Sequence, residues 1–480
     1  MTGTPDERGM NRTEGRAVDR ADNKGPEKVY DYGTGKEPIS GGTAIPDGGA
    51  DENPIPEEEP YEGVDAPEKQ PSPHGAPEPG SRENCYKTEA ADIEMCQSRK
   101  YDAGLPARAA SAMAADSLIP WCADPTTRGY TLTRREGCHK VGVVADWWKI
   151  SSNEPPKHIG TAIFLVREEM KLDNKGEWYQ RNFISPLSID GALGTVTLDY
   201  WDATCGGDTV CNREFIGPEF TGPTSWTTAS SVTEQTVQNR KFTWKTAALG
   251  KSESFDRGSF LGFKASGAPG AVKVTEPSWV FWEQIRCDQM MPNVASVGCV
   301  FPKHTPMFDL KHKSAEGAAL YYMEMRDKLN WHPGSKAHNS PLHREFDPVK
   351  RDANRAVVCP DSGQYALVLH PLATGDTKNT QCDEYAFAAS KESGGSQPDV
   401  TNGSQCLQAY ARKDADGKWR LYDDLRPPNT APSYTEKCAR ATMAGAQNER
   451  AGSRLSGFYT KNRMLDNDAY FIDVPGLVRP

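Results

Sequence analysis

Residues 381–388 read QCDEYAFA, and after three further residues the sequence continues at 392–395 with ESGG. Two adjacent carboxylates, Asp383 and Glu384, follow a cysteine and precede alternating aromatic and small residues. This alternation predicts a β-strand, in which neighbouring side chains point to opposite faces. One carboxylate would then enter a cleft as a general base or metal ligand, while the other makes a structural bond. Asp-Glu pairs are also common on solvated turns, so the stretch alone leaves both interpretations open.

The sequence around this stretch predicts a compact α+β domain over residues 346–480, preceded by a connecting segment, 301–345. Apolar residues at helical spacing predict a helix over 315–329 in the connecting segment. Within the domain, cap residues and apolar spacing predict four elements: a helix over 348–358 with Asp347 as its N-cap, helices over 432–444 and 446–459, and a strand over 469–474.

The motif at 382–388 resembles the signature of the NucA/NucB deoxyribonuclease family, in which CDEYPFA is followed by a Glu-Gly-Gly element. Further stretches agree with the order of the family's motifs: PLHR at 341–344, DANR at 352–355 with Cys359-Pro360, QNERAGS at 447–453 and LDND at 465–468. The resemblance covers about residues 340–475. Ala386 stands where the family has Pro, and Ser393 interrupts the Glu-Gly-Gly element.

The resemblance implies that the C-terminal α+β domain is similar to the ββα-metal nucleases, with an Asp in place of their catalytic His. On that basis Asp383 is the expected general base, and Asn448 is an expected ligand of one divalent cation, Mg²⁺ or Mn²⁺. Glu384 and Gln447 would complete or orient the shell of that metal. A cation that prefers oxygen ligands and keeps several waters needs few protein ligands.

Glu392 and His343 receive roles from the same resemblance, and the chemistry of phosphate binding adds an arginine. Glu392 would support the site as an additional carboxylate, and Arg450, on the helix of Asn448, would clamp phosphate. An ordinary surface arginine is the alternative for Arg450. His343, within PLHR, would contact phosphate or, in the interpretation we favour, serve in packing or capping.

Residues 85–300 predict a mostly-β domain of unknown function, with a sandwich as the expected architecture. Short β-branched and aromatic runs predict strands over 160–166, 194–200 and 241–244, and only the start, 89–117, resembles a helix. Trp-rich stretches suggest either sugar or peptide binding or ordinary core packing, and they contain Trp147, Trp148, Trp279 and Trp282.

Charge is distributed unevenly along the chain. Residues 1–84 hold 19 Asp and Glu against 9 Lys and Arg, whereas the remaining 396 residues hold 47 of each. With 12 Pro and 13 Gly, this acidic tail is expected to be disordered. Residues 301–480 hold 24 basic and 22 acidic residues, so binding to DNA phosphates would require the basic groups to cluster on one face.

The twelve cysteines include no CxxC pair, which favours disulfides over zinc sites. We expect bridges to stay within 85–300 and within 346–480, where the candidates are Cys359, Cys382, Cys406 and Cys438. Disulfides favour a secreted protein, although no signal-peptide pattern is evident. No apolar run approaches the roughly 18 residues of a membrane helix.

Together these features predict a metal-dependent, largely sequence-non-specific DNA endonuclease that acts outside the cell. One alternative is a secreted nuclease toxin, in which residues 85–300 serve delivery and an inhibitor or immunity protein is a partner. Another is a non-catalytic protein that binds cell wall or carbohydrate.

Overall fold

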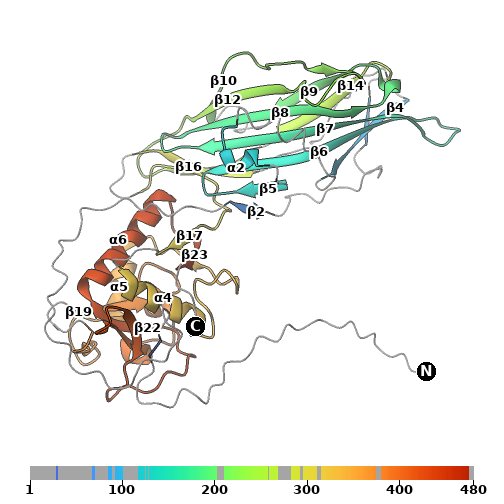
Figure 1. Ribbon diagram of the computed structural model, residues 1–480. Helices are drawn as coiled ribbons and strands as arrows, with labels where there is room; N and C mark the ends of the chain where they lie inside the picture. The colour runs from blue at the N-terminus through green and yellow to red at the C-terminus, as the bar shows by residue number, and fades with distance from the viewer. Residues whose placement is uncertain are drawn as a thin grey trace, which may run out of the picture.

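A computed structural model describes residues 29–30, 67–70, 85–88, 92–100, 117–124, 126–127, 129–202, 210–257, 259–268, 283–291, 296–310, 315–373 and 380–474 (Figure 1). Two short stretches of the acidic tail pair as strands: β1 (Val29–Tyr30) with β21, and β2 (Glu68–Gln70) with β5. The predicted disorder of the other tail residues lies outside the described part of the chain.

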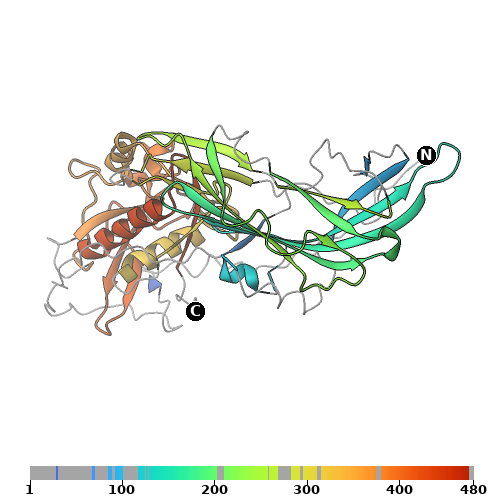
Figure 2. The same cartoon turned by 90° about the horizontal axis from the view of Figure 1, so that it is seen from above.

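The middle of the chain is built on one large antiparallel sheet of order β10-β12-β8-β7-β6-β4-β3, with β5 joined to β6 and β2 to β5 (Figures 1 and 2). Its long central strands are β6 (Glu136–Lys149), β7 (Lys157–Leu172) and β8 (Glu177–Ile189). The flanking strands are β3 (Cys85–Lys87), β4 (Ile93–Lys100), β5 (Gly129–Leu132), β10 (Cys211–Phe215) and β12 (Thr236–Trp244). The predicted mostly-β character is confirmed.

Two small sheets cover one face of the large sheet. The first contains β9 (Val196–Asp202), β11 (Ser225–Trp226) and β14 (Ser259–Ala265), and the second contains β13 (Ser252–Arg257), β15 (Glu283–Asp288) and β16 (Gly298–Val300). Phe164 of β7 stacks on Phe263 of the first small sheet, with ring centroids 4.2 Å apart. Trp178 of β8 meets Phe255 of the second at 5.5 Å. The result is two layers with an aromatic core between them.

The predicted helix over 89–117 is wrong where the structure describes it, because 93–100 form strand β4. Eight residues of β4 pair with β6, and a disulfide joins Cys96 to Cys85 on β3. The partners of β4 are strand β6 and Cys85 of β3. Contacts of this kind are made by strand pairing, which local propensity does not show. Residues 101–116 lie outside the described part of the chain.

The C-terminal domain is a mixed sheet of order β1-β21-β20-β22-β19. Its strands are β19 (Thr380–Tyr385), β20 (Leu407–Lys413), β21 (Trp419–Asp423) and β22 (Ala439–Ala444), and β22 runs directly into helix α6 (Gly445–Lys461). Helix α4 (Glu316–Lys328) packs against α6 on one face, and α5 (Pro348–Val358) lies on the other. A small sheet of β17 (Met307–Asp309), β18 (Leu342–His343) and β23 (Ala469–Asp473) completes the domain.

One hydrophobic core holds this domain together and includes the connecting segment. Tyr385 and Met443 project from the sheet toward Tyr322 of α4 and Phe458 of α6. Phe308 of β17 and Leu342 of β18 lie in the same core, so the described residues between them pack as part of the domain, whereas Phe301 lies in the core of the β-domain.

The predicted helices at 315–329, 348–358 and 446–459 and the strand at 469–474 are confirmed to within a few residues. The helix predicted over 432–444 is wrong, because 439–444 form β22. This strand is buried on both faces between β19 and β20, which overrides the helix propensity of its alanines.

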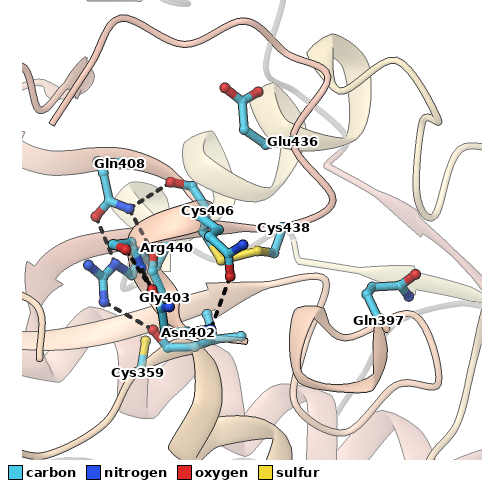
Figure 3. The surroundings of a disulfide bond; sticks show 12 residues. Cys359, Gln397, Asn402, Gly403, Cys406, Gln408, Glu436, Cys438 and Arg440 are labelled. Atoms are coloured by element: carbon cyan, nitrogen blue, oxygen red, sulfur yellow. Dashed lines mark hydrogen bonds between the residues drawn. A yellow bond between two sulfur atoms is a disulfide. The ribbon is translucent and has the colours of Figure 1, made fainter. Parts of the chain in front are cut away.

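Five disulfides are described: Cys85–Cys96, Cys122–Cys138, Cys287–Cys299, Cys359–Cys382 and Cys406–Cys438. Each lies within one domain, as predicted. Figure 3 shows Cys406–Cys438 beside Arg440, whose guanidinium donates to Gln408 Oε1 at 2.7 Å. None of the helices in the described part of the chain combines the length and apolar composition that a membrane crossing requires.

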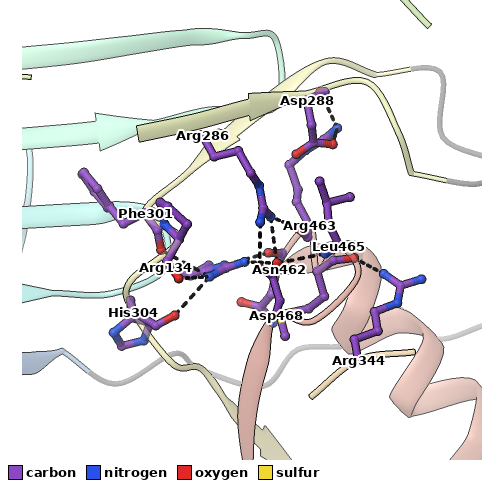
Figure 4. A network of polar contacts seen from close by, with 12 residues as sticks. Arg134, Arg286, Asp288, Phe301, His304, Arg344, Asn462, Arg463, Leu465 and Asp468 are labelled. Atoms are coloured by element: carbon purple, nitrogen blue, oxygen red, sulfur yellow. Dashed lines mark hydrogen bonds and ion pairs between the residues drawn. The ribbon is translucent and has the colours of Figure 1, made fainter. Parts of the chain in front are cut away.

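Buried ion pairs join the two domains (Figure 4). Asp468 of the C-terminal domain accepts from Arg134 at 2.5 Å and from Arg286 at 2.7 Å, both from the β-domain. A further pair has the arginine in the C-terminal domain and the acid in the β-domain: Arg463 donates to Asp288 of β15 at 2.7 Å. Arg134, Arg463 and Asp288 are at most 1% exposed. The domains therefore meet through a reciprocal charge network rather than through a flexible linker alone.

Candidate active site around strand β19

Asp383 and Glu384 sit on edge strand β19 and point to opposite faces of the sheet, as strand geometry predicts. Asp383 faces α4, where the Tyr322 hydroxyl donates to its Oδ2 at 2.8 Å. Glu384 faces α5, where Arg355 Nε lies 3.4 Å from its Oε1. The two consecutive carboxylates of the motif therefore lie in two separate environments, one on each face of the sheet.

Both carboxylates are buried, at 5% exposure for Asp383 and 7% for Glu384. Burial raises the pKa of Asp383 well above its usual value, and the nearby charge of Glu384 raises this pKa further, while the Tyr322 hydrogen bond opposes the shift. Burial also raises the pKa of Glu384, against the lowering effect of Arg355. Two close buried acids with one arginine leave a local need for positive charge.

The first turn of α6 places Asn448 against the same strand. Its Nδ2 donates to Gln381 Oε1 at 3.0 Å and to the Cys382 carbonyl at 3.4 Å. Gln381 in turn donates to Glu449 at 2.7 Å. Within the described part of the chain, no donor is hydrogen-bonded to Asn448 Oδ1, so this oxygen remains free to bind a ligand. Because β22 pairs with β19 and leads directly into α6, this direct connection fixes the placement of Asn448.

Gln447, the other residue expected to bind metal, has a different partner. Its Oε1 accepts the Gly317 backbone N–H at 2.8 Å, and the side chain is buried. This bond satisfies one of the free N–H groups in the first turn of α4. Gln447 thus ties α6 to α4, the helix that presents Tyr322 to Asp383.

Glu392 is paired with His343 rather than with the carboxylates of β19. Glu392 Oε2 accepts the His343 backbone N–H at 2.8 Å, and Glu392 Oε1 lies 2.7 Å from His343 Nδ1. The hydrogen bond to Glu392 raises the pKa of His343 and outweighs the effect of partial burial. Because Nδ1 is engaged and the imidazole is about one-third exposed, Nε2 is the ring nitrogen that can meet a ligand.

The remaining predicted cation, Arg450, lies on α6 two residues beyond Asn448 and is half-buried. The structure thus places Asp383 and Glu384 on opposite faces of β19 and holds Asn448 against Gln381 and Cys382 of the same strand. Gln447 instead bonds to α4, and Glu392 lies in a separate pair with His343.

The groups on or against β19 offer a carboxylate at Asp383, a hydroxyl at Tyr322 and an amide at Asn448, and such oxygens are the ligands that Mg²⁺ and Mn²⁺ prefer. Among the described residues there is no group of three or more His, Cys, Asp or Glu that could hold a metal. A cation here would be held by Asp383 and Asn448 Oδ1 and would keep most of its water. Such a sparse set fits a hard, hydrated ion and does not fit zinc.

Sequence reasoning did not identify Tyr322. It occupies an ordinary apolar position of α4, and only the packing of α4 on β19 shows its contact with Asp383, 61 residues later. Arg355 lies in the quoted DANR stretch, but its ion pair with Glu384 also required the fold.

Comparison with known proteins gives no further guidance, because no protein-family model, no curated protein and no solved structure matches this chain. The assignment of function therefore depends on the site itself and on the motif resemblance.

Proposed function

We propose that the C-terminal domain is a divalent-cation-dependent DNA endonuclease with little sequence preference. The observation that carries the proposal is the buried Asp383 on an edge strand, with Asn448 from the first turn of α6 beside the same strand. This pairing of residue types occurs at the motif that resembles the NucA/NucB family.

In the proposed reaction, a water oxygen attacks phosphorus as its proton passes to the Asp383 carboxylate. The bond from phosphorus to the leaving oxygen then breaks, and the leaving oxygen takes up a proton. Tyr322 holds Asp383 in place, and Asn448 Oδ1 is offered to the cation. A bound Mg²⁺ or Mn²⁺ would stabilise negative charge on the phosphate and supply the positive charge that the two buried acids require.

The five disulfides support an oxidising, extracellular setting for this activity. The same chemistry would serve a secreted toxin, for which an inhibitor or immunity protein would be a partner.

The test is relaxation of supercoiled plasmid by the purified full chain with Mg²⁺ or Mn²⁺. Asp383→Asn keeps the side-chain shape and removes the base, so we expect the rate to fall at least about 100-fold. The matched control is Asp361→Asn, an exposed acid of the same domain, which should change the rate less than about twofold.

EDTA should stop the wild-type reaction, and added Mg²⁺ or Mn²⁺ should restore it. A folded Asp383→Asn variant with wild-type activity, or a wild-type reaction that is indifferent to EDTA, would refute the proposal.

A further inference from the structure

A second cluster of polar and aromatic side chains lies at the far end of the β-domain, on the β6–β7 hairpin. Figures 1 and 2 show the turn between these strands at the end of the domain opposite to α4, α5 and α6. Strand β6 has 14 residues, so at about 3.3 Å per residue its end lies about 45 Å from its start. Arg134, which holds the C-terminal domain, stands just before that start.

Trp148 is the centre of this cluster. Its neighbour Trp147 is fully buried in the core between the two layers, so alternation turns Trp148 to the opposite face, where it is half-buried. The His158 ring, opposite Trp148 on β7, lies 4.7 Å from its ring centroid at 57°. The hairpin therefore presents the partly exposed indole of Trp148 in contact with the His158 imidazole. Trp279 and Trp282, the other predicted tryptophans, lie outside the described residues.

A short polar network adjoins the indole. Thr161 Oγ1 donates to Asp146 Oδ1 at 2.5 Å, and His158 Nε2 lies 3.4 Å from the same oxygen. Thr161 Oγ1 and His158 Nε2 are 3.1 Å apart. Neither Asp146 Oδ2 nor Trp148 Nε1 is hydrogen-bonded to any residue that the structure describes. A carboxylate oxygen that can accept and an indole N–H that can donate thus remain next to the ring.

The charges around the Trp148 indole and its polar neighbours favour a neutral ligand. Lys149 and Lys157 stand against Glu94, Asp146 and Glu154, so the local balance is slightly negative. A nucleic-acid site would combine aromatic side chains with an excess of positive charge. A flat aromatic face bordered by hydrogen-bonding groups suits a molecule with an apolar C–H face and hydroxyl groups at its edge. Pyranose sugars have that structure.

We propose that Trp148, His158, Asp146 and Thr161 form a binding site for a neutral pyranose polysaccharide. A sugar ring would stack on the Trp148 indole, while its hydroxyl groups exchange hydrogen bonds with Asp146 Oδ2 and the imidazole. The β-domain would then be an arm that anchors the chain to a polysaccharide surface. This proposal does not depend on nuclease activity, because it concerns the opposite end of the molecule.

The test is co-sedimentation of the full chain with insoluble cellulose, chitin and raw starch. We expect retention on at least one of them, and about a tenfold weaker retention for Trp148→Ala. Tyr179→Ala is the matched control, since Tyr179 is a half-buried aromatic residue on β8 of the same sheet, and it should bind as wild type. Thermal unfolding of each variant checks its fold.

Asp146→Asn supplies a second probe that keeps the side-chain shape, and we expect it to weaken retention about threefold or more. A soluble hexasaccharide of the same sugar should release the bound protein, which separates sugar recognition from adsorption to a solid. Three results would each overturn the proposal: no retention of the wild type on any polysaccharide, equal retention of a folded Trp148→Ala variant, or no release by the hexasaccharide. Binding of a dT oligonucleotide that is lost with Trp148 would instead identify a nucleic-acid site.

Discussion

Asp383 shows how far single residues could be predicted. The alternation of a strand places Asp383 and Glu384 on opposite faces, and their partners Tyr322 and Arg355 confirm it. The pairing of Glu392 with His343 spans 49 residues and depends on how β18 meets the loop after β19. No local pattern contains that information. For the same reason, the bond of Gln447 to Gly317 could be seen only in the fold.

The Tyr322 hydroxyl gives a prediction about pH. Its hydrogen bond lowers the otherwise raised pKa of Asp383, so Tyr322→Phe should raise this pKa further. Activity that requires ionised Asp383 is lost as pH falls through this pKa, so the acidic limb of the pH–rate profile should move to higher pH. On that limb we expect a roughly tenfold slower rate, since a hydrogen bond to a charged group is worth about 1.5 kcal/mol or more.

The measurement is the plasmid-relaxation rate of the full chain across a pH series. Tyr321→Phe is the control, because the buried Tyr321 hydroxyl has no hydrogen-bond partner among the described residues. An unmoved acidic limb in a folded Tyr322→Phe variant would show that Asp383 does not control the pH dependence.

At the scale of elements, the helices α4, α5 and α6 and the strands predicted over 160–166, 194–200, 241–244 and 469–474 were found, whereas β4 and β22 had been predicted as helices. Helix α5 begins where Asp347 caps it, and its Oδ1 accepts the Val349 N–H at 2.9 Å. By contrast, β22 and β4 owe their conformation to neighbouring strands and to disulfides at Cys438 and Cys96. A helix cap is local, whereas strand pairing is not, so the cap of α5 could be predicted from the sequence and the pairing of β4 and β22 could not.

The cap on α5 should contribute measurably to stability. Asp347→Ala removes the acceptor for the first turn and should cost about 1 kcal/mol, or roughly 2–4 °C in melting temperature. The control on the same helix is Asp352→Ala, whose exposed side chain makes only a 3.8 Å contact with Arg355 and should change stability by less than about 0.5 kcal/mol. Thermal unfolding followed by circular dichroism would decide, and equal melting temperatures for the two variants would contradict this assignment.

The whole molecule was the scale least accessible to prediction. Composition separates an acidic tail from a charge-balanced remainder, and the even numbers of cysteines in 85–300 (eight) and 346–480 (four) favour disulfides within each domain. Nothing in the spacing of Arg134, Arg286, Asp288, Arg463 and Asp468 shows that they meet. These ion pairs join residues more than 150 positions apart, so they are defined only by the folded arrangement of both domains.

The ion pairs between the domains lead to a prediction about unfolding free energy. Removing one partner of a buried ion pair should cost much more than removing one partner of an exposed ion pair. Asp288→Asn leaves the buried Arg463 without its charged partner and should cost about 3–5 kcal/mol in unfolding free energy. Asp199→Asn removes the same charge from the more exposed pair with Lys264 and should cost less than about 1 kcal/mol. Chemical denaturation of both variants measures the difference, and a cost below about 1 kcal/mol for Asp288→Asn would mean that the junction does not lock the domains.

The charge network at Asp468 also bears on what happens when the chain is cut. Arg134 and Arg286 hold Asp468 from one side, and Arg463 holds Asp288 from the other, independently of the peptide bonds that connect the domains. A protease that nicks the backbone between the domains would therefore leave two fragments travelling as a single particle. Under non-denaturing conditions their separation would require high salt or low pH, and the size of the native particle alone would not show that the backbone had been cut.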